Sequence, residues 1–252
     1  MSIKSISKLT IKNATILNPT GRGIETTDIL TLENVQMECK DRCLDLRGNG
    51  KAFIDATSSL KSIGGDATIF VYDDNGCVPE LTIQGEVSNS YSYNNGEWGG
   101  FAISSNGKCV TAGTKINIEE GAHISSDFDC AIYMPNSDVV TINGGRVEGV
   151  TGIYQKCGNL TINGGEVVGR GSKEYVYSGG GCNATGNAVV VEFTNYPNGL
   201  PTTTVNGGTL TSENRSGQIG YAKSPKCAET SSNAELAAAK ITADGYQLEA
   251  LN

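Results

Sequence analysis

Acidic side chains that could cleave a polysaccharide occur at two places in the sequence. Asp73 and Asp74 are adjacent, and Asp127 and Asp129 are two residues apart. A glycoside hydrolase needs two carboxyl groups that flank the scissile bond, one acting as acid and the other as base or nucleophile. The run Asp73–Gly76 (DDNG), however, is typical of a tight turn, because Asp, Asn and Gly tolerate the backbone angles that turns require. We therefore interpret it as a turn.

Other catalytic arrangements find less support. The sole histidine, His123, has no recognisable motif beside it, so a Ser/His or Cys/His nucleophile pair is not expected. Arg146 and Arg170 could line one face of a lyase, but no second basic group accompanies them. The run Ser178–Gly181 lacks the Lys-Ser/Thr ending of a phosphate-binding loop. No catalytic residue is assigned, and enzymatic activity is not expected.

Aromatic residues in two polar segments could bind sugars. Tyr91, Tyr93 and Trp98 lie in the first segment, and Tyr175 and Tyr177 lie in the second. Exposed aromatic rings present flat apolar faces on which sugar rings can stack, and these five residues are the candidate glycan site. The alternative is that the rings pack their own loops onto the body of the protein. Both interpretations stay open at this point.

Composition and charge exclude several classes of protein. The chain of 252 residues has a formal net charge of −8 and no run of Lys or Arg, so binding to nucleic acid or to an anionic membrane surface is not expected. No segment approaches the roughly 18 apolar residues of a membrane span. Glycine is abundant, with 33 residues, and aromatic residues make up only 6%. This balance favours a turn-rich all-β chain.

The cysteines follow no metal-binding pattern. Eight are spread along the chain without a CxxC motif: Cys39, Cys43, Cys77, Cys109, Cys130, Cys157, Cys182 and Cys227. With a single histidine, a structural zinc site is not expected, and no cofactor is predicted. The first ten residues lack the apolar core of a signal peptide, so we interpret the cysteines as reduced, buried thiols.

An internal repeat determines the expected fold. The segments VTINGGRV from Val140, LTINGGEV from Leu160 and TTVNGGTL from Thr203 are its clearest copies. Apolar residues alternate within each copy, as in a half-buried strand, and Asn-Gly-Gly supplies a corner. The third residues of eight such units are Ile11, Leu32, Ile54, Ile83, Ile118, Ile142, Ile162 and Val205. The base period of about 20 residues is too short for a propeller blade.

These units predict a single-stranded, right-handed parallel β-helix of about eight coils over residues 1–225. The eight anchor residues should form an aliphatic ladder inside the coils, with Asn143 above Asn163 and Arg146 above Glu166. Loop insertions are expected near residues 88–100 and 169–201. Residues 226–252 should form a cap or tail with a short helix that begins after Ser231 or Ser232. Tyr133 and Tyr154 recur at equivalent positions and should form a structural stack.

The repeats support a resemblance to a known family. Ala131–Pro135 (AIYMP), Gly152–Lys156 (GIYQK) and the repeated TINGG resemble units of pectin-lyase-like β-helix proteins of gut bacteria and their phages. The resemblance is strongest over residues 130–210 and implies no catalytic residue. It implies a non-enzymatic structural or adhesive rod, and a phage virion appendage such as a head fibre or decoration protein is the expectation preferred here.

Under this expectation the N-terminal end binds a capsid or other virion protein, the rod is a homo-oligomer, and the aromatic loops bind host or mucosal glycans. The protein would be made in the host cytoplasm and assembled into the virion. Two alternatives stay open. One is a polysaccharide lyase or hydrolase of the same fold, and the other is a secreted adhesin of the bacterial cell surface.

Overall fold

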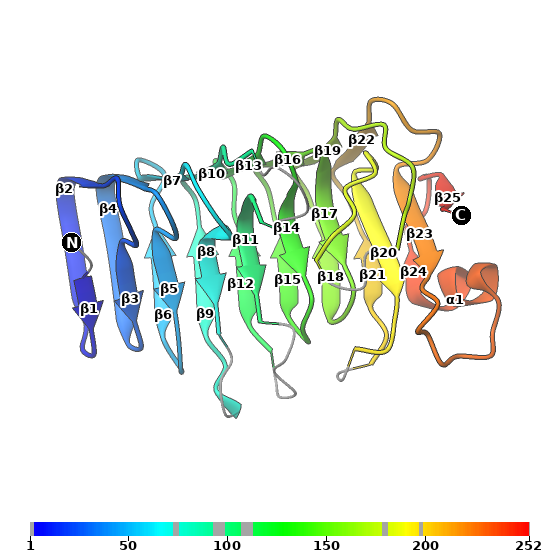
Figure 1. The fold of residues 1–252 in the computed structure, drawn as a ribbon, viewed down its shortest axis with the longest axis horizontal. Helices are drawn as coiled ribbons and strands as arrows, with labels where there is room; N and C mark the ends of the chain where they lie inside the picture. The colour runs from blue at the N-terminus through cyan, green and yellow to red at the C-terminus, as the bar shows by residue number, and fades with distance from the viewer. Residues whose placement is uncertain are drawn as a thin grey trace.

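Stacked parallel strands form the whole body of the molecule. The computed structural model describes residues 3–72, 76–92, 99–106, 113–177, 181–196 and 199–251. In this part of the chain, the strands form a ten-stranded and a fifteen-stranded sheet, and neighbouring strands run parallel (Figure 1). The predicted all-β parallel β-helix is confirmed, together with the short C-terminal helix α1 (Asn233–Lys240) at the end of the rod.

One strand from each successive coil contributes to the ten-stranded sheet. In order along the rod these strands are β1 (Ile3–Ser5), β3 (Ile24–Thr26), β5 (Leu44–Leu46), β8 (Ala67–Val71), β11 (Phe101–Ser105), β14 (Cys130–Met134), β17 (Thr151–Gln155), β20 (Val189–Phe193), β23 (Ile219–Lys223) and β25 (Leu248–Ala250).

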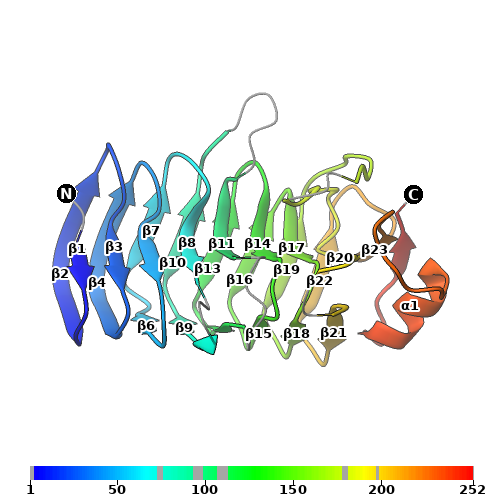
Figure 2. The ribbon, with the colours of Figure 1, turned by 60° about the horizontal axis from the view of Figure 1, so that its bottom comes forward.

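The fifteen-stranded sheet comprises two faces that meet at the long strands β2 (Leu9–Asn18) and β4 (Ile29–Cys39), because β4 pairs with both β6 and β7. The first face continues through β6 (Lys51–Ile54), β9 (Glu80–Ile83), β12 (Lys115–Ile118), β15 (Val139–Ile142), β18 (Asn159–Ile162), β21 (Thr202–Val205) and β24 (Ile241–Thr242). The second continues through β7 (Ser59–Ser62), β10 (Glu86–Asn89), β13 (His123–Ser126), β16 (Arg146–Gly149), β19 (Glu166–Gly169) and β22 (Thr209–Ser212). Each coil therefore has three faces (Figure 2).

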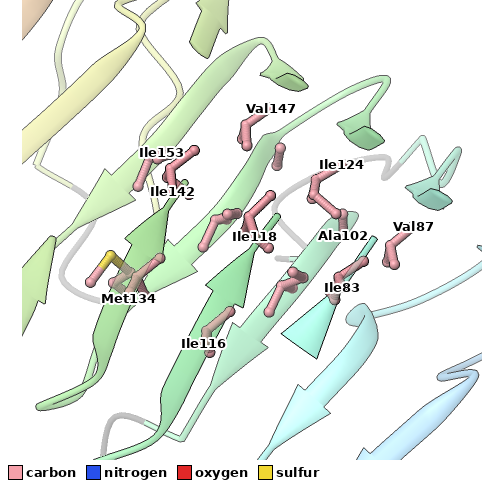
Figure 3. Packing of buried hydrophobic residues seen from close by; sticks show 14 of the residues in the cluster. Ile83, Val87, Ala102, Ile116, Ile118, Ile124, Met134, Ile142, Val147 and Ile153 are labelled. Atoms are coloured by element: carbon pink, nitrogen blue, oxygen red, sulfur yellow. The ribbon is translucent and has the colours of Figure 1, made fainter. Parts of the chain in front are cut away.

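The eight predicted anchors stack in register. Each is the backbone partner of the next, from Ile11 opposite Leu32 to Ile162 opposite Val205. The register continues across the two longest sequence intervals, which end at Ile118 and Val205. Figure 3 shows Ile83, Ile118 and Ile142 inside the coils. Burying each such side chain stabilises the fold by about 1.5–3 kcal/mol, so the ladder is a major part of the core.

The corner between the two faces depends on unusual backbone angles. Asn13 and Asn34 have positive φ angles of 51° and 54°, and the Asn34 side chain donates to Asn13 Oδ1 at 2.8 Å. In the later repeats glycine occupies the turn, as at Gly165 (φ 76°), where an added Cβ would lie 2.6 Å from a backbone oxygen. The crowding explains why the repeat keeps two glycines after its asparagine.

Side-chain ladders line the outside of the same corner. Asn163 Nδ2 donates to Asn143 Oδ1 at 3.0 Å, and Asn206 Nδ2 donates to Asn163 Oδ1 at 2.9 Å. Arg146 forms an ion pair with Glu166 on the next coil. Both predicted stacks are present. They connect coils at the surface, where the ion pair contributes little to stability.

The C-terminal tail closes one end of the rod. Ser232 caps α1 in a reciprocal arrangement with Glu235, and Leu236 and Ala237 of the helix are buried. The tail also contributes β24 and β25, which extend two faces of the rod and were not predicted. In the described chain, nine strands stack on the anchor face, one more than the eight expected. No helix among the described residues is long and apolar enough to cross a membrane.

Ile142 and Val139 on β15 test the contribution of the ladder. Ile142 is completely buried, whereas Val139 is 40% exposed. We expect Ile142→Ala to lower the free energy of unfolding by about 2–5 kcal/mol, since it leaves a cavity between two coils. Val139→Ala should change it by no more than about 0.5 kcal/mol. Urea unfolding followed by circular dichroism measures both changes. Equal losses would contradict the assigned register.

Candidate functional site

The ten-stranded sheet is buried on both of its sides. Each residue of β8, β11, β14, β17 and β20 is buried, whereas the strands of the other faces mostly alternate between buried and more exposed residues. Successive side chains of a strand point to opposite sides. On β17, Ile153 belongs to the core inside the coils, so Tyr154 lies outside them. A second apolar layer therefore covers the outer surface of this sheet.

We call this layer the outer cluster. Its buried members are Ala67, Phe70, Phe101, Cys130, Tyr133, Tyr154, Val190, Ala222 and Leu251. Tyr175 and Cys182, which belong to the segment between β19 and β20, pack against it, as does Tyr72. Described residues of the segment that interrupts the repeat thus cover part of the outer cluster.

Aromatic rings form a row in the outer cluster. The Phe101 and Tyr133 ring centroids are 5.1 Å apart, and those of Tyr133 and Tyr154 are 6.3 Å apart. Tyr133 is the backbone partner of Tyr154 on the next coil. The expected Tyr133–Tyr154 stack is confirmed. Burial raises the pKa of both hydroxyls well above its usual range, so they stay protonated as hydrogen-bond donors.

A buried ion pair lies at the centre of the layer. Lys156 Nζ is 3.3 Å from Glu192 Oε1, and the two side chains are 1% and 0% exposed. The other carboxylate oxygen, Oε2, accepts hydrogen bonds from the hydroxyls of Tyr154 at 2.5 Å and Tyr175 at 3.0 Å. Lys156 Nζ also lies 5.7 Å from the centre of the Tyr196 ring. These contacts offset the desolvation of both charges.

Sulfur and carboxylate atoms converge at one edge of the outer cluster. Cys130 Sγ is 3.1 Å from Cys182 Sγ, which is 2.5 Å from Asp129 Oδ1. The Asp129 carboxylate also accepts the backbone N–H of Cys130 at 2.8 Å. Burial raises the pKa of Asp129 to about 6. Thiolates and carboxylates are zinc ligands, but the described residues offer three such groups here, one fewer than a closed structural zinc site uses.

A charged network covers the N-terminal part of the same sheet. The Arg42 guanidinium carbon lies 3.9 Å from the centre of the Phe70 ring. Arg42 also pairs with Asp45, at 3.0 Å, and with Asp66, and it donates to the Tyr72 hydroxyl. Only 7% of Arg42 is exposed. The positive charge of Arg42 is therefore neutralised by carboxylates of the protein itself.

The aspartates considered for polysaccharide cleavage lie in different settings. Asp73 and Asp74 lie outside the described residues. Asp127 is exposed, whereas Asp129 is 3% exposed and bonded to the residues beside it. These two side chains therefore differ in environment.

The basic candidates lie on another face of the rod. His123 Nε2 is 2.9 Å from Glu148 Oε1, and Arg146 contacts the same carboxylate at 2.9 Å. His123 and Arg146 are backbone partners on adjacent coils. Arg170 donates to the backbone oxygen of Ser126 at 3.0 Å. Each group is engaged in a contact between coils.

Three of the five candidate glycan-binding aromatics lie among the described residues. Tyr93 and Trp98 lie outside the described residues. Tyr91 is half-buried, and its backbone N–H donates to Asn89 Oδ1 at 2.9 Å. Tyr175 is half-buried against the outer cluster, while Tyr177 is half-buried two residues further along. Their role in glycan binding stays a prediction.

Sequence reasoning missed the polar members of the outer layer. Lys156, Glu192 and Cys182 were not singled out as site residues. The run Val189–Phe193 (VVVEF) contains the signal, because a strand without alternation is buried on both sides. A glutamate in such a run requires a buried partner. Its partner, Lys156, lies on the adjacent coil, and no sequence pattern around Lys156 indicates that it is buried.

Comparisons with known proteins identify no relative. No family model, curated protein or solved structure matches the chain. The fold is therefore confirmed by the structure alone. Kinship with pectin-lyase-like proteins of phages and gut bacteria stays a prediction.

Glu192→Gln tests the buried pair. We expect it to lower the free energy of unfolding by about 3–5 kcal/mol, because Lys156 would be left buried without its counter-ion. The double variant Lys156→Met/Glu192→Gln should be less destabilised than the single one. Glu166→Gln, which removes one partner of the exposed Arg146–Glu166 ion pair, is the control. It should lower the free energy of unfolding by less than about 1 kcal/mol. Urea unfolding of the four proteins makes the comparison. A Glu192→Gln loss no larger than that of the control would contradict the buried pairing.

Proposed function

We propose that the protein is a non-enzymatic structural and adhesive rod, of the type that serves phage virions as a head fibre or decoration protein. The observation that supports this proposal most strongly is the closed state of the outer cluster. A general acid or base must come within hydrogen-bond distance of its substrate. Glu192 and Lys156 are buried and form an ion pair with one another. Glu192 also accepts hydrogen bonds from the hydroxyls of Tyr154 and Tyr175.

The stacked fold suits a mechanical role. Successive coils bond to one another along three faces as far as β22, beyond which the tail extends two of them, and asparagine ladders connect the outer corner. At about 4.8 Å per coil, ten stacked strands make a rod of roughly 43 Å. The strands of each coil pair only with those of the neighbouring coils, so the rod can present a loop at its side while the core stays unchanged.

The proposal assigns contact with a capsid or other virion protein to the first coil. The basic side chains Lys4, Lys12 and Arg22 of this coil form ion pairs with Glu25, Glu33 and Asp41 of the next coil, so they support the stack rather than a partner. Ile6 and Leu17 on this coil are 83% and 68% exposed. Apolar surface at the end of a stack of strands favours contact with another protein. Formation of a homo-oligomer is part of the same proposal.

The adhesive part of the proposal rests on the side loops. Tyr91 and Tyr177 keep part of their surface exposed, on segments that leave the repeat. Half-exposed tyrosines offer an apolar face and a polar edge, which suits the stacking of host or mucosal sugars. The Tyr175 hydroxyl donates to Glu192, and this bond would hold the second segment in place for contact with a sugar.

A binding and cleavage assay tests this function. The purified protein is incubated with bacterial and mucin polysaccharides, and retention on the polymer and release of reducing or unsaturated chain ends are measured together. We expect retention on at least one polymer and no release of chain ends. Tyr177→Ala should weaken retention roughly fivefold to tenfold. Tyr246→Ala, on the C-terminal tail, is the matched control and should leave retention unchanged.

Two outcomes would contradict the proposal. Sustained release of chain ends would establish a lyase or hydrolase and overturn the non-enzymatic assignment. Absence of retention on every polymer would overturn the adhesive part and leave an architectural rod.

A further inference from the structure

The contact between Cys130 and Cys182 joins two separate parts of the fold. Cys130 is the first residue of β14 and is fully buried, whereas Cys182 belongs to the segment between β19 and β20 and is partly exposed. Their Sγ atoms are 3.1 Å apart although 52 residues separate them in the sequence. One thiol is thus fixed on the rod, and the other is carried by the segment that covers the outer cluster.

The distances favour a covalent link over a shared metal ion. Two thiolates on a tetrahedral zinc ion, each at about 2.3 Å from the metal, lie roughly 3.8 Å apart. The observed Sγ–Sγ distance of 3.1 Å is shorter than this, and Cys182 Sγ lies only 2.5 Å from Asp129 Oδ1. A disulfide bond is about 2.05 Å long, so the thiols need to approach by about 1 Å. That approach needs only a small movement of the covering segment.

We propose that Cys130 and Cys182 are a site of oxidative cross-linking, at which a low-molecular-weight disulfide converts the two thiols into a bond that fastens the covering segment to the rod. This goes beyond the proposed function, since it holds whether the rod binds glycans or not. The bond closes a large loop and holds Tyr175 over the Lys156–Glu192 pair.

The reaction balances with one external disulfide. Cys182, which is the more exposed of the two residues, gives its proton to solvent, and its sulfur attacks one sulfur of the reagent. The reagent's disulfide bond breaks, and half of it leaves as a thiol after it takes up a proton. Cys130 then attacks the Cys182 sulfur of the mixed disulfide and releases the second half, which takes the Cys130 proton. Two protein thiols are oxidised, and one disulfide is reduced to two thiols.

Asp129 is placed to slow the first step. Burial, the Cys130 thiol and the Asp129 carboxylate all raise the pKa of the Cys182 thiol well above its usual range, so the attacking thiolate is disfavoured. The Asp129 carboxylate is 2.5 Å from the sulfur, and its pKa of about 6 leaves it ionised at neutral pH. Asp129 therefore holds the thiol in its protonated form, because its negative charge opposes formation of the thiolate.

Two other cysteines of the described chain, Cys39 and Cys43, lie in a more enclosed environment. Cys39 and Cys43 both belong to the sealed core inside the coils. A dissolved disulfide has no path to these sulfurs while the coil is folded, whereas Cys182 faces solvent with part of its surface. Reaction in the folded protein should therefore be selective for Cys130 and Cys182.

The test starts from protein purified under reducing conditions and then treated with oxidised glutathione or with the smaller disulfide cystamine. After free thiols are alkylated, intact mass and peptide mapping count and locate the remaining reactive cysteines. We expect loss of two alkylatable thiols and a linked pair of peptides that contain Cys130 and Cys182. The melting temperature should rise by roughly 5–10 °C.

Variants separate the cross-link from general reactivity. Cys182→Ser, in the covering segment, should abolish the linked peptide and the rise in melting temperature, and Cys227→Ser should preserve both. Asp129→Asn, which keeps the shape of the side chain and removes its charge, should speed up cross-linking at pH 7 by about tenfold. An unchanged rate in that variant would overturn the role of Asp129.

Three results would overturn the cross-link itself. They are complete alkylation of every cysteine after oxidation, a glutathione adduct on Cys182 that never transfers to Cys130, and stoichiometric zinc in native mass spectra that Cys182→Ser removes. The last result would show a metal site in place of a redox site.

Discussion

Backbone hydrogen bonding between successive coils is the constraint on which the rest of the structure depends. A parallel ladder accepts a neighbour only in register, and a shift by one residue would turn every inward side chain outward. Each coil must therefore present an aliphatic residue at the same place as the coil before it. The pairing of Ile118 with Ile142 and of Ile142 with Ile162 follows from this requirement. Extra residues are accommodated only between strands, where they leave the ladder undisturbed.

The same constraint explains why polar groups are buried on one face. Tyr175 and Cys182, between β19 and β20, pack over outward side chains of the ten-stranded sheet and shield them from water. Charged groups there must then be neutralised by neighbours on adjacent coils. Lys156 and Glu192 satisfy this need together, with Tyr154 and Tyr175 bonded to the carboxylate. The result is a second core outside the coils rather than an open cleft.

The inward-facing part of the fold was largely predictable, because each anchor carries a local mark: an aliphatic residue before a turn of Asn, Gly or a close substitute. The ladder from Ile11 to Val205 is present as expected, and so is the asparagine stack at Asn143 and Asn163. The outer layer was not predictable to the same degree. The contact of Cys130 with Cys182 depends on how a long segment without the repeat folds over its neighbours, which periodicity does not specify. The pairing of strands β24 and β25 was missed for a similar reason, since the tail departs from the repeat.

Chemical labelling of lysine in the folded protein tests most directly whether the outer cluster is closed to solvent. The protein is treated with an acylating reagent under native conditions, and the extent of labelling at each lysine is measured by mass spectrometry. We expect Lys156, which is 1% exposed, to stay unlabelled while the exposed Lys4 and Lys12 react. Unfolding the protein in urea should make all three react alike. Labelling of Lys156 at the rate of the surface lysines in the folded protein would contradict the account and indicate a cleft accessible to substrates.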